Sequence, residues 1–77
     1  MVKISIIGAG AVGAQTASLI AQRQLGDVVL IDILGDMAKG KALDIAQSLP
    51  ILGSPVSVIG GDNYTLTKNS AIVVIVA

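Results

Sequence analysis

The stretch that decides the fold is IIGAGAVGAQTA, residues 6–17, in which an apolar run ends and a helical pattern begins. Three glycines, Gly8, Gly10 and Gly13, stand at this junction. A glycine inside a helix is about 1 kcal/mol less favourable than an alanine. Three of them together therefore indicate that other atoms must approach the backbone closely here.

Around this stretch, strand patterns and helix patterns alternate along the chain. Short apolar runs rich in β-branched residues predict strands at residues 2–7, 27–31, 56–59 and 71–77. The last run is apolar throughout, which is typical of a central, buried strand. Glycines and polar residues at 60–63 predict a loop after the third strand.

Two helices and one shorter helical turn are expected between these strands. Small and apolar residues at helical spacing predict a first helix over 11–24, with Gly26 as its left-handed cap. We expect Asp36 to be the N-cap of a second helix that runs to about Ser48 and is ended by Pro50. A single helical turn is expected at 65–69. Strands alternating with helices predict an α/β fold with a parallel sheet and right-handed crossovers.

A strand followed by GAGAVG and then a helix matches the fingerprint G-x-G-x-x-G of dinucleotide-binding sites. In this motif the first glycine permits a sharp turn, the second lets a pyrophosphate approach, and the third lets helix and strand pack closely. Free N–H groups at a helix N-terminus also favour phosphate. The expected pyrophosphate-binding residues are Gly8, Ala9, Gly10, Ala11, Val12 and Gly13.

Asp32 supplies the second half of this pattern, because it stands nineteen residues beyond Gly13 at the end of the second strand. A carboxylate there accepts hydrogen bonds from both hydroxyls of an adenosine ribose and repels a 2′-phosphate. No arginine follows it closely, so the predicted cofactor is NAD rather than NADP. Asp62 and Asn63 are expected to have turn roles, and Tyr64 is expected to be a packing residue.

The same residues leave other interpretations open. The glycines and Asp32 would also suit tight packing and a solvated turn, without any ligand. Flavoproteins that bind FAD share the glycine fingerprint, and methyltransferases hold S-adenosylmethionine with a related loop that usually lacks the third glycine. No lysine follows the loop at the P-loop spacing, which argues against a triphosphate site.

The composition excludes several further classes of function. Five basic residues balance five acidic ones, and there is one tyrosine, so we expect no nucleic-acid partner. The chain contains no cysteine, histidine or glutamate, so we expect neither a metal site nor a catalytic residue within it. Only 13% of residues are charged, against about 25% in typical soluble domains. We therefore expect these residues to belong to a longer protein or to pair with another chain.

Residues 4–22 are uncharged and follow Lys3, which is a pattern shared with secretory signal peptides. Glycines interrupt the apolar core of this run, and a membrane span is further disfavoured by Gln15 and Gln22. We therefore expect a cytoplasmic protein without a membrane partner.

Four segments together resemble a known family: KISIIGAGAVG, LGDVVLIDI, GKALDIAQSLPI and NYTLTKNSAIVVIVA. They are similar to the N-terminal quarter of malate dehydrogenases, in the branch most similar to lactate dehydrogenases, and the likeness covers essentially the whole chain. The GKALDI segment favours malate over lactate dehydrogenases. The resemblance implies that residues 8–13 hold the NAD pyrophosphate and that Asp32 holds the adenosine ribose.

The resemblance also implies an activity, namely the interconversion of (S)-malate and oxaloacetate by hydride transfer to and from NAD. It implies a cytoplasmic homodimer or homotetramer of the tricarboxylic acid cycle. In that family the substrate-binding arginines, the histidine base and its aspartate partner follow the fourth strand, and none of them is present here. Residues 1–77 are therefore expected to form the first half of a Rossmann domain, with strand order 3-2-1-4 and without the substrate domain. Two alternatives remain, the NAD-binding part of a lactate dehydrogenase and a stand-alone fragment that binds adenine nucleotides without catalysis.

Overall fold

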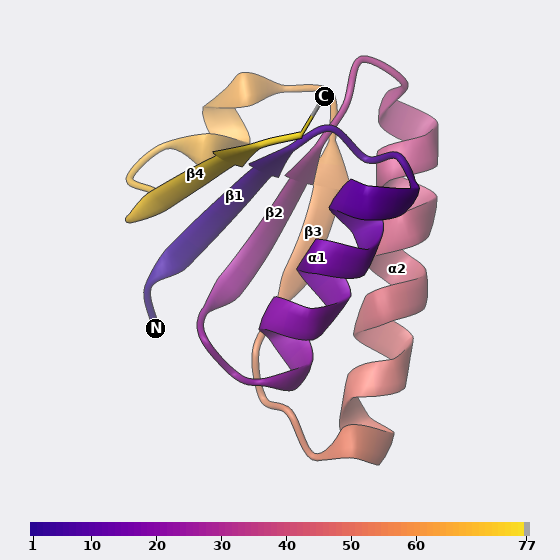
Figure 1. Cartoon of the computed structure of the whole chain (residues 1–77), viewed down its shortest axis with the longest axis vertical. Coiled ribbons are helices and arrows are strands. Elements are labelled where there is room, and N and C mark those ends of the chain that lie inside the picture. The colour runs from indigo at the N-terminus through magenta and orange to yellow at the C-terminus, as the bar shows by residue number, and fades with distance from the viewer. Residues whose placement is uncertain (77) are drawn as a thin grey trace.

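The computed structural model describes residues 1–76, in which strands and helices alternate along the chain (Figure 1). The elements are β1 (Lys3–Ile7), α1 (Ala11–Gln22), β2 (Asp27–Ile31), α2 (Gly35–Leu52), β3 (Val58–Gly61), the 3₁₀ helix η1 (Tyr64–Thr67) and β4 (Ile72–Ile75). All neighbouring strands pair in parallel, in the order β3-β2-β1-β4. The predicted α/β fold and its strand order are confirmed.

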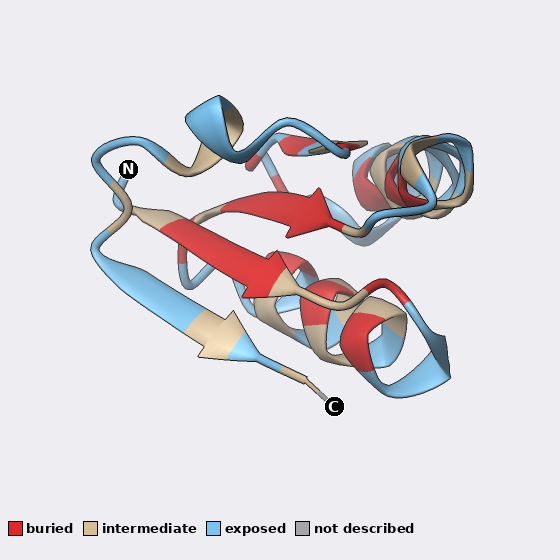
Figure 2. Cartoon of the chain, turned by 90° about the horizontal axis from the view of Figure 1, so that it is seen from above, coloured by how far each residue is buried: buried red, intermediate tan, exposed pale blue. Residues whose placement is uncertain are grey.

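Two different layers cover the two faces of the sheet. Helices α1 and α2 lie against one face, and the segment containing η1 lies on the other (Figures 1 and 2). Alternation along β1 explains this division, because Ile6 points into the core that the helices share, whereas Lys3 and Ser5 contact the η1 segment. The core is therefore built between the sheet and the two helices.

Helix α1 presents a face of small residues to the sheet, with Gly13, Ala17 and Ala21 all buried. Its predicted end was wrong, because the helix stops at Gln22 and the left-handed residue is Gln24, with φ of 56°. Gly26 has another role: a Cβ added to it would lie 2.6 Å from the carbonyl oxygen of Val2. The glycine is thus required by close approach to the start of β1.

Helix α2 is longer at both ends than its sequence predicts. Asp36 is not the N-cap, because the helix begins at Gly35 with Leu34 as the N-cap residue. The Leu34 N–H donates to a carboxylate oxygen of Asp32, so the chain turns into the helix early. Pro50 lies inside the helix rather than ending it, and the preceding residue, Leu49, is buried in the core. The helix ends at Leu52, and its C-cap residue, Gly53, has φ of 74°.

Strand β3 begins and ends two residues later than predicted, so Gly60 and Gly61 belong to the strand and not to a loop. A Cβ on Gly60 would lie 2.4 Å from the carbonyl oxygen of Ala38, which means that α2 packs too closely for any side chain there. Gly60 is therefore required by the contact between helix and sheet, at a place where the sequence pattern alone indicates a turn.

Strand β4 is an edge strand among the described residues, and it is not buried as its apolar sequence predicts. Ile72, Val73 and Ile75 are respectively 55%, 52% and 79% exposed. Residue 77, the end of the predicted strand, lies outside the described residues. The helical turn predicted at 65–69 is present as η1, which begins one residue and ends two residues earlier. Within residues 1–76, neither helix combines the length and the apolar character that crossing a bilayer requires.

Candidate functional site

The glycine-rich loop lies between β1 and α1, at the edge of the sheet where the parallel strands end (Figure 1). Gly8 has φ of 112°, a left-handed value that side chains rarely adopt, and its added Cβ would lie 2.6 Å from the carbonyl oxygen of Val76. A Cβ on Gly13 would lie only 1.7 Å from the carbonyl oxygen of Gly8. These two glycines are thus required by the turn and by the close packing of α1, as the motif predicts.

Gly10 differs from the other two glycines because the fold itself does not require it. Its φ of −67° suits any residue, and an added Cβ would meet no atom within 4 Å. The open space lies at the start of α1, where Gly10 is the N-cap residue and no side chain caps the helix. The first N–H groups of a helix have no partner within it. Gly10 therefore leaves room for a ligand beside the exposed residues Ala11 and Val12.

Asp32 follows β2 directly and faces this loop across the end of the sheet. One carboxylate oxygen accepts a hydrogen bond from the N–H of Ala9 at 2.7 Å, and the other accepts one from the N–H of Leu34 at 3.0 Å. These donors, Leu34 first and then Ala9, lower the pKa of Asp32 below its ordinary value, because they stabilise the charged form. Asp32 therefore carries a negative charge at neutral pH.

A cleft of about 340 Å³ joins these features. It is lined by Gly8, Gly10, Ala11, Val12, Gly13, Asp32 and Val76. Six of the seven residues predicted for the cofactor site therefore lie around one cavity. The seventh, Ala9, is fully buried and contributes through its backbone N–H to Asp32.

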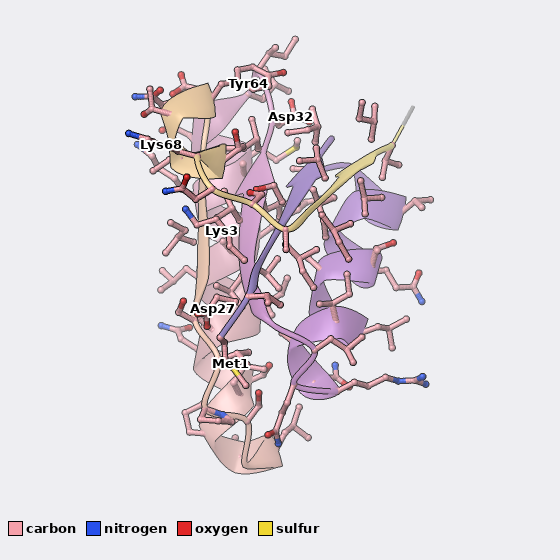
Figure 3. The ribbon with its side chains drawn as sticks, turned by 90° about the vertical axis from the view of Figure 1, so that its left-hand side faces the viewer. Met1, Lys3, Asp27, Asp32, Tyr64 and Lys68 are labelled. Carbon is pink, nitrogen blue, oxygen red and sulfur yellow. The ribbon has the colours of Figure 1, made fainter. Side chains whose placement is uncertain are left out.

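A second hollow of about 260 Å³ continues the site past Asp32, towards η1. It is lined by Ile7, Gly8, Asp32, Ile33, Tyr64, Ile75 and Val76. The sequence interpretation of Tyr64 as a packing residue was wrong, because its side chain is 58% exposed and borders this hollow. The sequence did contain one indication of this role: Tyr64 comes shortly after the third strand, where the parallel strands end and the cleft lies. Figure 3 shows Tyr64 and Asp32 at this same end of the molecule.

The two parts of the cleft have opposite electrostatic character. The N-terminus of α1 offers backbone donors and a partial positive charge, which suits an anion such as a phosphate. Asp32 offers carboxylate oxygens that accept hydrogen bonds from hydroxyl groups. The cleft therefore suits a ligand that carries a phosphate next to a sugar diol, with the phosphate at the start of α1 and the diol at Asp32.

Comparison with known proteins agrees with this geometry. The family profile described as lactate/malate dehydrogenase, NAD binding domain, matches residues 2–77. The malate dehydrogenase of Geobacillus sp. (strain WCH70) is 54% identical over 77 residues, which cover 97% of this chain and 25% of that protein. The chain thus spans about a quarter of the length of the curated relatives that it matches.

Solved structures give the same result. The apo form of malate dehydrogenase from Picrophilus torridus matches with a TM-score of 0.94 and 42% identity, over 99% of this chain and 25% of that one. The lactate dehydrogenase of Cryptosporidium parvum, complexed with lactic acid and β-nicotinamide adenine dinucleotide, matches with a TM-score of 0.96 and 41% identity, over 99% of this chain and 24% of that one. The resemblance noted from the sequence is confirmed: the chain belongs to the lactate/malate dehydrogenase family, and residues 2–77 correspond to its NAD-binding domain.

Proposed function

We propose that the protein is an NAD-dependent malate dehydrogenase, which interconverts (S)-malate and oxaloacetate, and that residues 1–77 hold the ADP half of its cofactor. The observation that carries this proposal is the open space at Gly10, which faces the Asp32 carboxylate across one cleft. The family assignment and the curated malate dehydrogenases at about half identity support the choice of reaction.

The pyrophosphate is assigned to the start of α1. We propose that the N–H groups of Ala11 and Val12 bind it, and that the missing side chain of Gly10 gives it access to them. Gly8, Ala9 and Gly13 shape the loop, since two of them tolerate no side chain and the third is held by Asp32. The cofactor is thus bound largely by backbone atoms, which explains why the site depends on glycines.

The adenosine ribose is assigned to Asp32. Each of its carboxylate oxygens already accepts one backbone hydrogen bond and retains a lone pair for a hydroxyl. A 2′-phosphate in this place would bring a second negative charge against the carboxylate. NAD is therefore preferred over NADP.

The chain's own residues bind and orient the cofactor, and none of them is assigned a role in proton transfer. When bound, NAD supplies the hydride acceptor of the reaction. Asp32 and the start of α1 fix the adenosine and pyrophosphate groups, and this limits where the nicotinamide end of the same molecule can reach. Substrate binding and acid–base catalysis are assigned to residues outside 1–77.

The direct test of the reaction is the rate of NADH oxidation by the full-length protein with oxaloacetate and, separately, with pyruvate. A malate dehydrogenase consumes NADH with oxaloacetate and much more slowly with pyruvate. The reverse preference would establish the lactate dehydrogenase alternative. Binding of NAD without turnover of either substrate would support the fragment that binds adenine nucleotides without catalysis, and the intact mass of the purified protein would identify such a fragment.

We further propose a cytoplasmic homodimer or homotetramer that serves the tricarboxylic acid cycle. Support for self-association of the whole protein comes from the family resemblance. The exposed apolar side chains of β4 would lead a fragment of residues 1–77 alone to associate or aggregate. Light scattering on the purified full-length protein measures its mass in solution, and a monomer would contradict this part of the proposal. Cell fractionation tests the compartment.

A further inference from the structure

Two residues of β1, Ser5 and Lys3, hold the connection between β3 and β4. Ser5 bonds the hydroxyl of Ser70, close to β4, whereas Lys3 bonds the end of η1. The ammonium nitrogen of Lys3 donates to the carbonyl oxygen of Leu66 at 3.0 Å and to that of Lys68 at 2.9 Å. Its backbone carbonyl oxygen also accepts a hydrogen bond from the N–H of Ala71 at 2.8 Å. Figure 3 shows Lys3 on the same side of the sheet as Lys68, with Tyr64 farther along towards the end that carries Asp32.

The two carbonyl oxygens that Lys3 holds belong to the C-terminal end of η1. Carbonyl groups at the C-terminal end of a helix have no N–H partner within the helix. A hydrogen bond from a charged donor is stronger than one between neutral groups. Directly after these two carbonyl groups the chain reverses at Asn69, whose φ is 65°. The ammonium of Lys3 therefore fixes this end of η1 relative to β1, just before the turn into β4.

The opposite end of η1 carries Tyr64, which borders the cleft beside Asp32. The side-chain oxygen of Asn63 accepts hydrogen bonds from the backbone N–H and the hydroxyl of Thr65, at 2.9 Å and 2.8 Å. The hydroxyl of Thr67 donates to the carbonyl oxygen of Tyr64 at 2.7 Å. The four residues of η1 thus form one short, internally bonded unit, with Lys3 at one end and the tyrosine ring at the other.

We propose that Lys3 is a positioning residue of the cofactor site: by holding the end of η1 against β1, it sets where the Tyr64 ring stands beside the adenosine end of the cleft. This inference rests on the proposed function, because it assigns the adenosine end of NAD to the hollow between Asp32 and Tyr64. An aromatic ring at such a place presents a flat surface on which a base stacks.

A purely structural role for Lys3 makes a different prediction. If Lys3 only stabilises the connection, its replacement lowers the melting temperature but leaves the affinity of the folded protein for AMP unchanged. If it acts through Tyr64, the affinity falls in protein that is fully folded. The fall then depends on the presence of the tyrosine ring.

The experiment is a double-mutant cycle in the full-length protein, with Lys3→Met, Tyr64→Ala and the combined variant, titrated with NAD and with AMP below their melting temperatures. Lys3→Met is expected to lower the affinity for both ligands by about five- to tenfold, because the charged hydrogen bonds that hold η1, and with it the Tyr64 ring, are lost. In the Tyr64→Ala background, Lys3→Met is expected to lower the affinity by less than about twofold, because the effects of two residues that act as one unit are not additive.

Lys68→Met is the matched control. This variant removes an ammonium group from the same surface. It keeps the contact with Lys3, because Lys3 bonds the backbone carbonyl oxygen of residue 68, which is present whatever the side chain. Its affinity for AMP is expected to equal that of the wild type. If Lys3→Met fails to fold, Lys3→Gln replaces it in the cycle, because it keeps a side-chain donor but removes the charge that bonds the two carbonyl oxygens.

The outcomes separate the two proposals. A wild-type protein that binds neither NAD nor AMP would overturn the proposed function, and the role of Lys3 with it. Wild-type binding together with unchanged affinity in Lys3→Met would overturn only the role of Lys3. A loss of equal size with and without the Tyr64 ring would also contradict it, because Lys3 would then act by another route.

Discussion

The contrast between Gly10 and Gly13 gives the sharpest prediction about the loop. The two glycines stand three residues apart in one motif, yet a Cβ at Gly10 meets no atom within 4 Å and a Cβ at Gly13 meets the Gly8 carbonyl oxygen at 1.7 Å. Gly10→Val is therefore expected to remove cofactor binding from a folded protein. Gly13→Ala, a smaller change, is expected to destabilise the fold.

The magnitudes follow from these surroundings. In Gly10→Val the side chain occupies the place assigned to the pyrophosphate, so hydrogen bonds from the Ala11 and Val12 N–H groups to a charged acceptor are lost. At about 1.5–3 kcal/mol each, their loss weakens NAD binding by more than about a hundredfold. The fold loses only the preference of the N-cap position for glycine over valine, about 1 kcal/mol.

In Gly13→Ala the added carbon must be relieved by moving backbone, because both nearest atoms belong to the Gly8 carbonyl group. Real Cβ atoms essentially never stand closer than 3.0 Å to such neighbours, so α1 must shift by more than 1 Å from β1. Overpacking of this kind costs upwards of about 3 kcal/mol of unfolding free energy.

Thermal unfolding and calorimetric titration with NAD, carried out on the full-length variants, measure the two effects separately. The expected result is a near-normal melting temperature without binding for Gly10→Val, and a clearly lowered melting temperature for Gly13→Ala. Tight NAD binding by a folded Gly10→Val protein would refute the assignment of the phosphate to this loop. Normal stability of Gly13→Ala would refute the packing argument.

Three further predictions concern Asp32 and α2. Asp32→Ala is expected to lower the affinity for NAD by about ten- to a hundredfold and the affinity for NADP by less. Titrations with both cofactors measure these affinities. Asp27→Ala, at the other end of β2, is the control that should keep the preference for NAD. Because backbone N–H groups lower the pKa of Asp32 in the folded state, its stabilising contribution is present above its unfolded pKa of about 3.9 and is lost as the pH falls through the lower, folded value. Unfolding midpoints measured between neutral and acid pH should therefore show a smaller acid-induced loss in Asp32→Asn, and an unchanged acid limb would contradict the assigned hydrogen bonds. Gly40→Ala, inside α2 with open space around the added carbon, should raise the unfolding free energy by up to about 1 kcal/mol in denaturant titrations, and a decrease would mean that the helix needs a glycine there.

The sequence predicted the fold, and it predicted which residues line the candidate cleft, because both depend largely on local patterns. The glycines of the motif from Gly8 to Gly13 indicate by themselves that other backbone atoms come close. Asp32 directly follows a strand, and this position places its side chain where the parallel strands of the sheet end. The strand order 3-2-1-4 was expected from the resemblance to the N-terminal quarter of malate dehydrogenases, and the structure confirms it. These features require no knowledge of which side chains meet across the core.

The features that were missed depend on tertiary contacts. The ends of α2 differ because the Leu34 N–H bonds to Asp32 at one end and Leu49 is buried at the other. Gly60 belongs to β3 because Ala38 packs against it, which no sequence window reports. Tyr64 was interpreted wrongly because its place beside the cleft depends on how η1 packs against β1 and β2.

We propose that one cleft holds the phosphates at the start of α1 and the ribose at Asp32. The decisive experiment is a crystal structure of the full-length protein with NAD. We expect pyrophosphate oxygens within hydrogen-bond distance of the Ala11 or Val12 N–H groups, with the adenosine ribose hydroxyls on the Asp32 carboxylate. NAD bound elsewhere, or bound here with its ribose away from Asp32, would contradict it.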